Sequence, residues 1–502
     1  MKAGVNPYFE DLGRSADLGR LARRGGVVLV GSVYGNGALQ VAGAILLARL
    51  LTPEDFGLVA IVMVLTRFAP LLIDFGLGDA LVQKAQITHS QVSTLFWLST
   101  GIGIAFAAGL AVCSPLIASL YQEPRLQPIA LTFAATFVFT GLSSQHMALL
   151  RRAMQFVVIA RIQLLSALAG FIAAILIAIS GHGYWALVLR PVVSAVGVAA
   201  GTWLACSWRP GFPVFDVQAT PMLRFGMHVL SFSIISSVTW SMDRIALGLF
   251  YLPSVVGLYQ NALNMFENAL LAPISQLHNV GAAALSKLSS SPAALREKYK
   301  ATLSALAFFV MPAAAIMSVT AQDVAVILLG ERWRQSGLLL SIMVSWGIVA
   351  FIEQSQGWLH VSSGRADRWK NWGIVTFVVR AAAILAGLPF GAEGVAIALV
   401  VAGWLIAFPS VSYAGSPLGI GAGLALRAVH GPLLGATIAC AAGWWLRAAF
   451  LDDFTSVLRI VLLSLFCGSI YLLIVMGLFR IVEPIRIASK LLQDFRSHLP
   501  RR

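Results

Sequence analysis

The sequence predicts an all-α polytopic membrane protein with about 14 transmembrane helices. Hydrophobic residues make up 58% of the 502 residues and charged residues only 11%, against about 25% charged residues in a soluble domain. The apolar residues form continuous runs, such as ALTFAATFVFTGL at 130–142, rather than the alternating pattern of a membrane barrel. Many of these runs approach the roughly 20 residues that a helix needs to cross a bilayer.

The predicted spans follow one another with short connections. In chain order they are 26–50, 56–78, 92–116, 128–149, 157–179, 184–206, 226–250, 256–282, 300–320, 336–360, 371–389, 393–413, 427–446 and 456–480. Because this number of spans is even, both termini are predicted to lie on the same side of the membrane.

The basic residues orient these spans. Of the 35 Lys and Arg residues, 24 fall in the segments on the side of the termini, four fall on the other side, and seven lie within or at the ends of spans. Cytoplasmic loops accumulate Lys and Arg, so we predict that both termini lie in the cytoplasm. The net charge of +14 is therefore a topology signal that suits anionic membrane lipids and needs no nucleic-acid partner.

Two short turns indicate an internal repeat. Residues 53–58 read PEDFGL and residues 253–258 read PSVVGL, so Pro, Gly and Leu recur at a constant offset of 200 residues. A helical hairpin can reuse these residues, because Pro restricts φ and Gly permits a tight reversal. SGHGYWALV at 180–188 and FGAEGVAIALV at 390–400 form a second echo. Six spans separate the copies, so the two halves run in the same direction; chance similarity of apolar segments is the alternative explanation.

The repeat predicts two six-helix bundles followed by two further helices. The predicted parts are a basic cytoplasmic tail at 1–25, a first bundle at 26–210, a cytoplasmic linker at 211–225, a second bundle at 226–415, the two further helices at 416–481 and a basic cytoplasmic tail at 482–502. In transporters built from parallel repeats, the substrate site lies near the middle of the membrane, and one half moves against the other.

Several segments between residues 25 and 410 resemble a known family. They are ARLLTPEDFGLVA (48–60), DFGLGDALVQK (74–84), ALLRRAMQF (148–156), GYWALV (183–188) and SMDRIALGLFYLPSVVGLYQNA (241–262). These segments are similar to the polysaccharide transporter family of the multidrug/oligosaccharidyl-lipid/polysaccharide exporter superfamily. The last two predicted helices match that family only in number and placement.

This resemblance implies a flippase that moves an undecaprenyl-diphosphate-linked oligosaccharide for O-antigen or exopolysaccharide synthesis. A polysaccharide polymerase and chain-length machinery are the further partners that it implies. It implies no cofactor, and coupling to protons, sodium or membrane potential stays open. A drug/cation antiporter and a peptidoglycan-precursor flippase of the same superfamily are the alternatives.

Polar side chains at helical spacing predict a hydrated cleft for sugar hydroxyls. Residues three, four or seven positions apart share one face of a helix. The candidate substrate-binding residues of this kind are Asn36, Gln40, Ser236, Asn261 and Asn264. Such side chains also hydrogen-bond neighbouring membrane helices, so packing is their alternative role.

Ionisable side chains within spans are costly and therefore mark candidate sites. Arginine can bind a diphosphate through two parallel hydrogen bonds and stays charged when buried; the candidates are Arg67, Arg190, Arg244 and Arg380. Asp243 and Glu267 are candidate carriers of a coupling ion, because a low-dielectric site can raise the pKa of a carboxylate. Asp243 and Arg244 are expected to point to different faces of their helix, whereas Arg161 and Arg459 are expected to extend to the lipid headgroups.

Enzyme and metal-site interpretations have little support in the sequence. The four cysteines lie singly, without a CxxC or Cys/His cluster, so we predict no metal site and no disulfide. A membrane glycosyltransferase or polymerase is the enzyme alternative, since Glu54 and Asp55 lie in the first predicted outer loop. That loop is only a few residues long, and the longest outer segment, 321–335, is too short for a sugar-binding domain. The sequence therefore predicts a transporter without catalytic residues.

Overall fold

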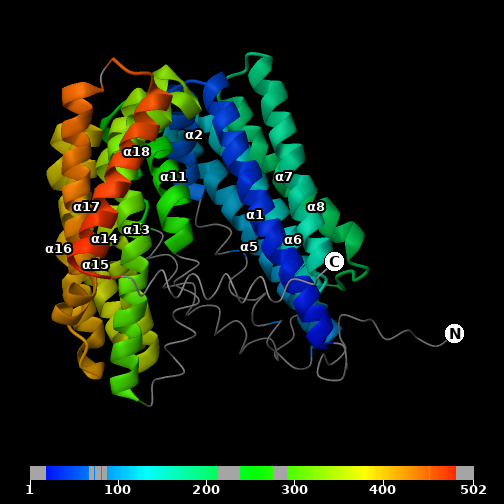
Figure 1. Ribbon diagram of the computed structural model, residues 1–502. Helices are drawn as coiled ribbons and strands as arrows, with labels where there is room; N and C mark the ends of the chain where they lie inside the picture. The colour runs from blue at the N-terminus through cyan, green and yellow to red at the C-terminus, as the bar shows by residue number, and fades with distance from the viewer. Residues whose placement is uncertain are drawn as a thin grey trace, which may run out of the picture. The chain divides into compact units, whose positions relative to one another are not determined.

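The computed structural model describes residues 18–66, 73, 81, 87–212, 238–274, 291–451 and 453–481, and the regular structure of these residues is entirely helical (Figure 1). The helices are α1 (Leu18–Leu50), α2 (Pro53–Thr66), α5 (His89–Leu120), α6 (Leu126–Arg152), α7 (Phe156–Ile179), α8 (Trp185–Ala205), α10 (Met242–Phe250), α11 (Pro253–Phe266), α13 (Pro292–Leu329), α14 (Arg334–Ser363), α15 (Ala366–Gly387), α16 (Gly391–Gly415), α17 (Ala422–Phe450) and α18 (Ser456–Leu472). Short π-helical turns follow α11 at Glu267–Leu271 and α18 at Leu473–Leu478.

Nine helical stretches of the described residues are long and apolar enough to cross a membrane. One of them, Asp367–Leu418, contains both α15 and α16. The prediction of a multi-pass helical membrane protein is thereby confirmed. Every predicted span overlaps a described helix, but the spans at 56–78, 226–250 and 256–282 lie partly outside the described residues, so the count of fourteen stays a prediction.

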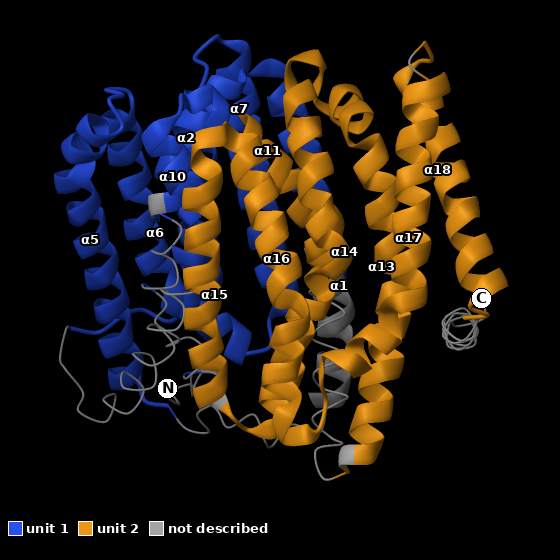
Figure 2. Ribbon diagram, turned by 90° about the vertical axis from the view of Figure 1, so that its left-hand side faces the viewer, with its two compact units in different colours: residues 1–257 blue, residues 258–502 orange. Residues whose placement is uncertain are grey.

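Contacts divide the chain into two compact units, residues 1–257 and 258–502 (Figure 2). In the first unit, α5 packs along α6, α7 along α8, and α6 against α8. In the second unit, α13 packs along α14, α15 along α16, and α14 against α16, while α17 and α18 pack on α13. The same pairing in the same chain order is what a parallel repeat predicts.

Features of the helices extend the repeat beyond the two echoes in the sequence. The dipeptide Ser-Gln lies at 144–145 in α6 and again at 355–356 in α14. The residues that cap the C-termini of these helices, Ala153 and Gly364, are separated by the same 211 residues. Gly183 and Gly394 share this offset as well, so one register relates the later helices of both units.

The two Pro–Gly turns contact each other within the first unit. A Cβ atom added to Gly57 would overlap the carbonyl oxygen of Pro253, and one added to Gly257 would overlap the carbonyl oxygen of Pro53. Glycine is needed at both positions, because the backbones approach too closely for any side chain. This reciprocal contact, together with the packing of α10 on α2, explains why the first unit extends to residue 257. The predicted linker at 211–225 lies mostly outside the described residues.

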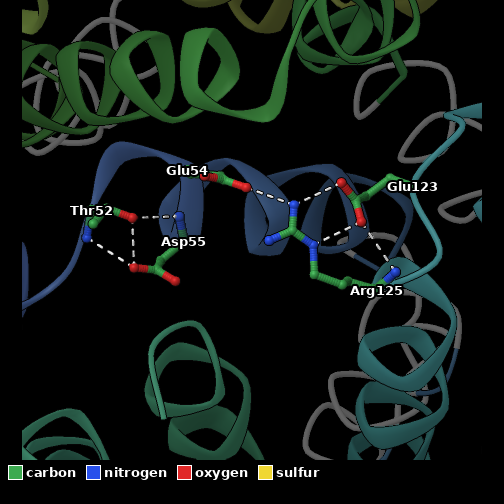
Figure 3. A network of polar contacts seen from close by, with 5 residues as sticks. All are labelled: Thr52, Glu54, Asp55, Glu123 and Arg125. Atoms are coloured by element: carbon green, nitrogen blue, oxygen red, sulfur yellow. Dashed lines mark hydrogen bonds and ion pairs between the residues drawn. The ribbon is translucent and has the colours of Figure 1, made fainter. Parts of the chain in front are cut away.

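Polar contacts join the α1–α2 turn to the α5–α6 turn at the end of the first unit that is predicted to face the periplasm (Figure 3). Thr52 caps α2, because its Oγ1 atom accepts the Asp55 backbone N–H at 3.3 Å, while its own backbone N–H donates to Asp55 Oδ2 at 2.9 Å. The Arg125 Nη2 atom donates to Glu54 Oε1 at 2.6 Å and to Glu123 Oε2 at 2.8 Å. The Arg125 hydrogen bond holds the pKa of Glu123 below its usual range, and the two carboxylates raise the pKa of Arg125.

Replacing Gly57 by alanine should destabilise the protein by about 1–3 kcal/mol, because the new methyl group would overlap the Pro253 carbonyl oxygen. The matched control is Gly109→Ala in α5, where nothing lies within 4 Å of an added Cβ. This control should be neutral or slightly stabilising, since alanine favours a helix. Thermal unfolding of the purified variants checks the difference; equal unfolding temperatures would contradict the contact.

Protonation of Glu123 should weaken the contact between the two turns. Because the pKa of Glu123 is lowered in the folded protein, its stabilising effect is present at neutral pH and is lost as the pH falls through the folded-state pKa. At pH 7, the free energy of unfolding of Glu123→Gln should therefore be lower than that of wild type by on the order of 0.5 kcal/mol. The gap should close in acid; the control Glu297→Gln removes an exposed carboxylate and should be as stable as wild type at pH 7.

Candidate functional site

The predicted site residues fall into two sets, one in each unit. Asn36, Gln40, Arg190, Asp243 and Arg244 lie in the first unit, whereas Asn261, Asn264, Glu267 and Arg380 lie in the second. Arg67 and Ser236 are outside the described residues. The candidates are therefore described as local arrangements within each unit.

Two polar side chains of α1 lie one helical turn apart. Gln40 is exposed and Asn36 is half-buried. The Asn36 Oδ1 atom is shielded from solvent and has no hydrogen-bond partner among the described residues. An unsatisfied acceptor in an apolar helix is costly, so this amide is suited to accept a hydrogen bond from a ligand hydroxyl.

Arg190 of α8 is held by an aromatic ring. Its guanidinium carbon lies 4.6 Å from the centroid of Phe171 in α7, and this ring is confined by α1, where a Cβ on Gly43 would overlap it. Cation–π contacts orient a guanidinium without neutralising its charge. No carboxylate in the described part of the chain forms an ion pair with Arg190, so its positive charge stays available to an anion.

Arg244 and Asp243 form an ion pair, so the expectation that they point to different faces is wrong. The Arg244 Nε atom lies 3.4 Å from Asp243 Oδ1, and both side chains are buried. The reason is a break in the predicted span 226–250: Trp240 and Ser241 form a turn, and α10 begins only at Met242. The guanidinium folds back over this break and donates to the Trp240 carbonyl oxygen. Arg244 therefore satisfies a local backbone group and a neighbouring carboxylate.

The amides of α11 differ in their hydrogen bonding. Gln260 Nε2 donates to Asn264 Oδ1 at 2.7 Å, and Asn268 Nδ2 donates to the Asn264 carbonyl oxygen at 2.8 Å. Asn261 is buried, and its Nδ2 atom has no partner among the described residues. Asn264 therefore has a role in helix structure, whereas Asn261 presents an unsatisfied donor.

Glu267 begins the π-helical turn Glu267–Leu271, which ends two residues before Pro273. Proline lacks an N–H and its ring crowds the carbonyl group four residues earlier, so a wider turn relieves the clash. Such π-helical turns occur frequently at functional sites. The half-buried Glu267 carboxylate is thus placed where the helix is irregular.

Arg380 belongs to a buried cluster that the sequence analysis missed in part. The Trp346 Nε1 atom donates to Glu353 Oε2 at 3.3 Å, and the Arg380 guanidinium carbon lies 5.6 Å from the Trp346 ring. Glu353 and Arg380 are 7% and 8% exposed, and their charges interact. Glu353 was missed because it lies near the polar end of a predicted span. Its spacing of seven residues from Trp346, on the same helix face, was the available signal.

A second buried charge cluster joins α13, α17 and α18. Asp323 is 2% exposed and lies 3.1 Å from Arg447 Nη1 and 2.8 Å from Arg459 Nη2. The expectation that Arg459 extends to the headgroups is therefore wrong. Arg447 also donates to the Val319 carbonyl oxygen, so this cluster holds α17 and α18 onto α13.

Among the described residues, no group of three or more His, Cys, Asp or Glu side chains is arranged to hold a metal ion. The four cysteines are unbridged, and Cys206 and Cys467 are buried. Their surroundings are apolar, which is usual for structural cysteines.

Replacing Asp323 by asparagine should strongly destabilise the second unit, because two buried guanidinium groups would lose their carboxylate. Removing one partner of a buried ion pair typically costs about 3–5 kcal/mol. The matched control is Glu331→Gln, since Glu331 forms an exposed pair with Arg334 and should contribute little. Thermal unfolding in detergent checks this; equal losses in both variants would exclude a structural role for the Asp323 cluster.

Comparison with known sequences identifies relatives along most of the chain. A family model described as "Polysaccharide biosynthesis protein" matches residues 46–337. The chain is similar to the lipopolysaccharide biosynthesis protein WzxC of Escherichia coli (strain K12), with 25% identity over 74% of this chain and 75% of that protein. It is 24% identical to the teichuronic acid biosynthesis protein TuaB of Bacillus subtilis (strain 168) over 74% of this chain and 76% of that protein. The succinoglycan biosynthesis transport protein ExoT of Rhizobium meliloti (strain 1021) is 27% identical over 47% of this chain and 48% of that protein.

Solved structures share the fold. The lipid II flippase MurJ in an inward closed conformation matches with a TM-score of 0.67 and 14% identity over 89% of this chain and 99% of that chain. A multidrug resistance MATE family transporter of the MOP superfamily, in an inward-facing conformation, matches with a TM-score of 0.54 and 14% identity over 76% of this chain and 94% of that chain. The fold class and the prediction of a transporter rather than an enzyme are confirmed. Because the family model covers more than half of the 502 residues, the chain belongs to the polysaccharide biosynthesis protein family.

Proposed function

We propose that this protein is a flippase that carries an undecaprenyl-diphosphate-linked oligosaccharide repeat unit across the bacterial inner membrane for O-antigen or exopolysaccharide synthesis. The observation that carries this proposal is the family match over residues 46–337 in a chain with the fold of a lipid II flippase. The names of WzxC, TuaB and ExoT support a glycan as cargo. The positive-inside pattern supports cytoplasmic termini, and the proposed direction of movement is from the cytoplasmic to the periplasmic leaflet.

The diphosphate and the sugars require different groups within the membrane. Arg190 is the proposed diphosphate ligand, because its guanidinium is oriented by Phe171 and forms no ion pair with a described carboxylate. Asn36 and Asn261 are proposed ligands of sugar hydroxyls, since each has a shielded amide atom without a described partner. Gln40, Asn264, Arg67 and Ser236 remain proposed substrate contacts.

Alternating access requires parts of the helices that can bend. The break at Trp240–Ser241 and the π-helical turn at Glu267–Leu271 interrupt the seventh and eighth predicted helices. Backbone irregularities of this kind can absorb the dihedral changes of a conformational step. We assign Glu267 to ion coupling, with Glu353 as a second candidate, whereas Asp243 is engaged by Arg244. The coupling ion would be a proton or sodium, unless membrane potential alone drives the cycle.

Deletion of the gene in a host that makes the glycan tests this proposal. Lipid-linked repeat units should accumulate on the cytoplasmic face and the exported polysaccharide should disappear. Accumulation of a peptidoglycan precursor instead would favour that flippase alternative. Unchanged glycan with altered drug tolerance would favour a drug/cation antiporter, and either result would overturn the proposal.

Complementation of this deletion strain tests Arg190. Arg190→Ala should reduce export by about tenfold or more, because a diphosphate would lose a charge-assisted pair of hydrogen bonds. The matched control is Arg161→Ala in the adjacent helix α7, where the arginine is exposed. Export is compared at equal membrane abundance. Equal export by both variants would remove Arg190 from the site.

A further inference from the structure

A shallow groove lies at the predicted cytoplasmic end of the second unit. It has a volume of about 690 Å³ and is formed by the start of α15, the last turns of α16 and the start of α17. Phe408, Pro409 and Ala422 contribute apolar surface, whereas Arg368, Ser412 and Ser416 contribute polar groups. This groove is separate from the candidate transport residues and belongs to the second unit alone.

Arg368 is fixed in the wall of this groove. Its Nη2 atom donates to the Tyr413 carbonyl oxygen at 2.6 Å and to Ser416 Oγ at 2.8 Å. Its guanidinium carbon lies 4.3 Å from the centroid of the Tyr413 ring. The Nε atom is buried and makes no hydrogen bond to the described residues. The exposed Asp367 carboxylate accepts the Arg368 backbone N–H and pairs with Arg365, and no described carboxylate forms an ion pair with the Arg368 guanidinium. A positive charge of defined orientation is therefore left without a counter-ion.

The surroundings add positive potential and supply a neutral donor. Ser412 Oγ accepts the Ala422 N–H at 2.8 Å, which brings the positive end of the α17 dipole to the groove. The hydroxyl hydrogen of Ser412 is still available, whereas the Ser416 hydroxyl donates to the Tyr413 carbonyl oxygen at 3.2 Å. The sequence contains no Asp or Glu between Gly394 and Leu451, so the end of α16 that lines the groove and the whole of α17 carry no acidic side chain that would repel an anion.

The rims of the groove match the boundary between acyl chains and headgroups. Leu405 lies one helical turn before Pro409 and is 67% exposed, and Leu426 lies one turn after Ala422 and is 47% exposed. On the other side, Arg365 and Lys370 are exposed. Apolar side chains exposed on membrane-spanning helices face lipid, and basic residues at the cytoplasmic ends of spans attract anionic headgroups.

We propose that this groove binds an anionic phospholipid of the cytoplasmic leaflet. The lipid phosphate would accept hydrogen bonds from the guanidinium of Arg368 and the hydroxyl of Ser412, and an acyl chain would pack on Phe408 and Pro409. The net negative charge of the headgroup complements the uncompensated cation, whereas a zwitterionic headgroup brings its own positive charge. This site is independent of the proposed transport function, because none of its residues belongs to the transport candidates.

Native mass spectrometry of the full-length protein in detergent tests the site. Phosphatidylglycerol should bind wild type more tightly than phosphatidylcholine, and Arg368→Gln should weaken phosphatidylglycerol binding by about tenfold, as expected for loss of charged hydrogen bonds. The matched control, Arg334→Gln at the start of α14, removes the same charge from an exposed residue paired with Glu331 and should bind as wild type does. Equal binding of both lipids to wild type, or unchanged phosphatidylglycerol binding by Arg368→Gln, would overturn the proposal.

A second measurement separates lipid binding from folding, since Arg368 also bonds the end of α16. Phosphatidylglycerol should raise the unfolding temperature of wild type and of Arg334→Gln, but not that of Arg368→Gln, whatever the unfolding temperature of each protein without lipid. Ser412→Ala should show an intermediate rise. Competition identifies the occupant: undecaprenyl phosphate that displaces phosphatidylglycerol at equal concentration would assign the groove to the carrier lipid and overturn the phospholipid assignment.

Discussion

The need to satisfy buried charge within hydrocarbon governs the described structure. A guanidinium inside a membrane span is tolerated only when the protein supplies partners for its charge and its hydrogen bonds. Arg447 and Arg459 share Asp323, and Arg447 gains a carbonyl oxygen as well. Arg244 uses the adjacent Asp243 and a carbonyl group freed by a helix break. These arrangements hold helices in place. Arg190 differs from them, because its guanidinium contacts an aromatic ring and forms no ion pair with a described carboxylate.

Composition and continuous apolar runs were sufficient to predict the helical architecture, because helix length and hydrophobicity are local properties. The recurring Pro–Gly turns predicted its repeat. Charge pairing was harder to predict. Adjacent residues point in different directions on a regular helix, so no ion pair between Asp243 and Arg244 was expected. The break before Met242 allows the two side chains to meet. The partner of Arg459 lies on α13, far away in sequence, and only the tertiary structure brings the two together. Glu353 was missed for a similar reason, because its place in a buried cluster depends on contacts with Trp346 and Arg380.

The candidate residues separate into those that the chain satisfies and those that it does not. Asn264 and Arg244 are occupied by their own neighbours, and Arg380 belongs to the cluster around Trp346. Asn36 and Asn261 instead keep shielded amide atoms without described partners. This contrast marks Asn36 and Asn261 as the candidates whose amide atoms the described residues leave open to a ligand.

The reciprocal contact between the Pro–Gly turns has the form of an interface between identical subunits, in which residue i meets residue j and residue j meets residue i. Here both participants are covalently part of one chain. The association of two separate subunits weakens on dilution, since its extent follows mass action. Internal duplication removes that dependence, so the contact persists even when very few copies of the protein occupy the membrane.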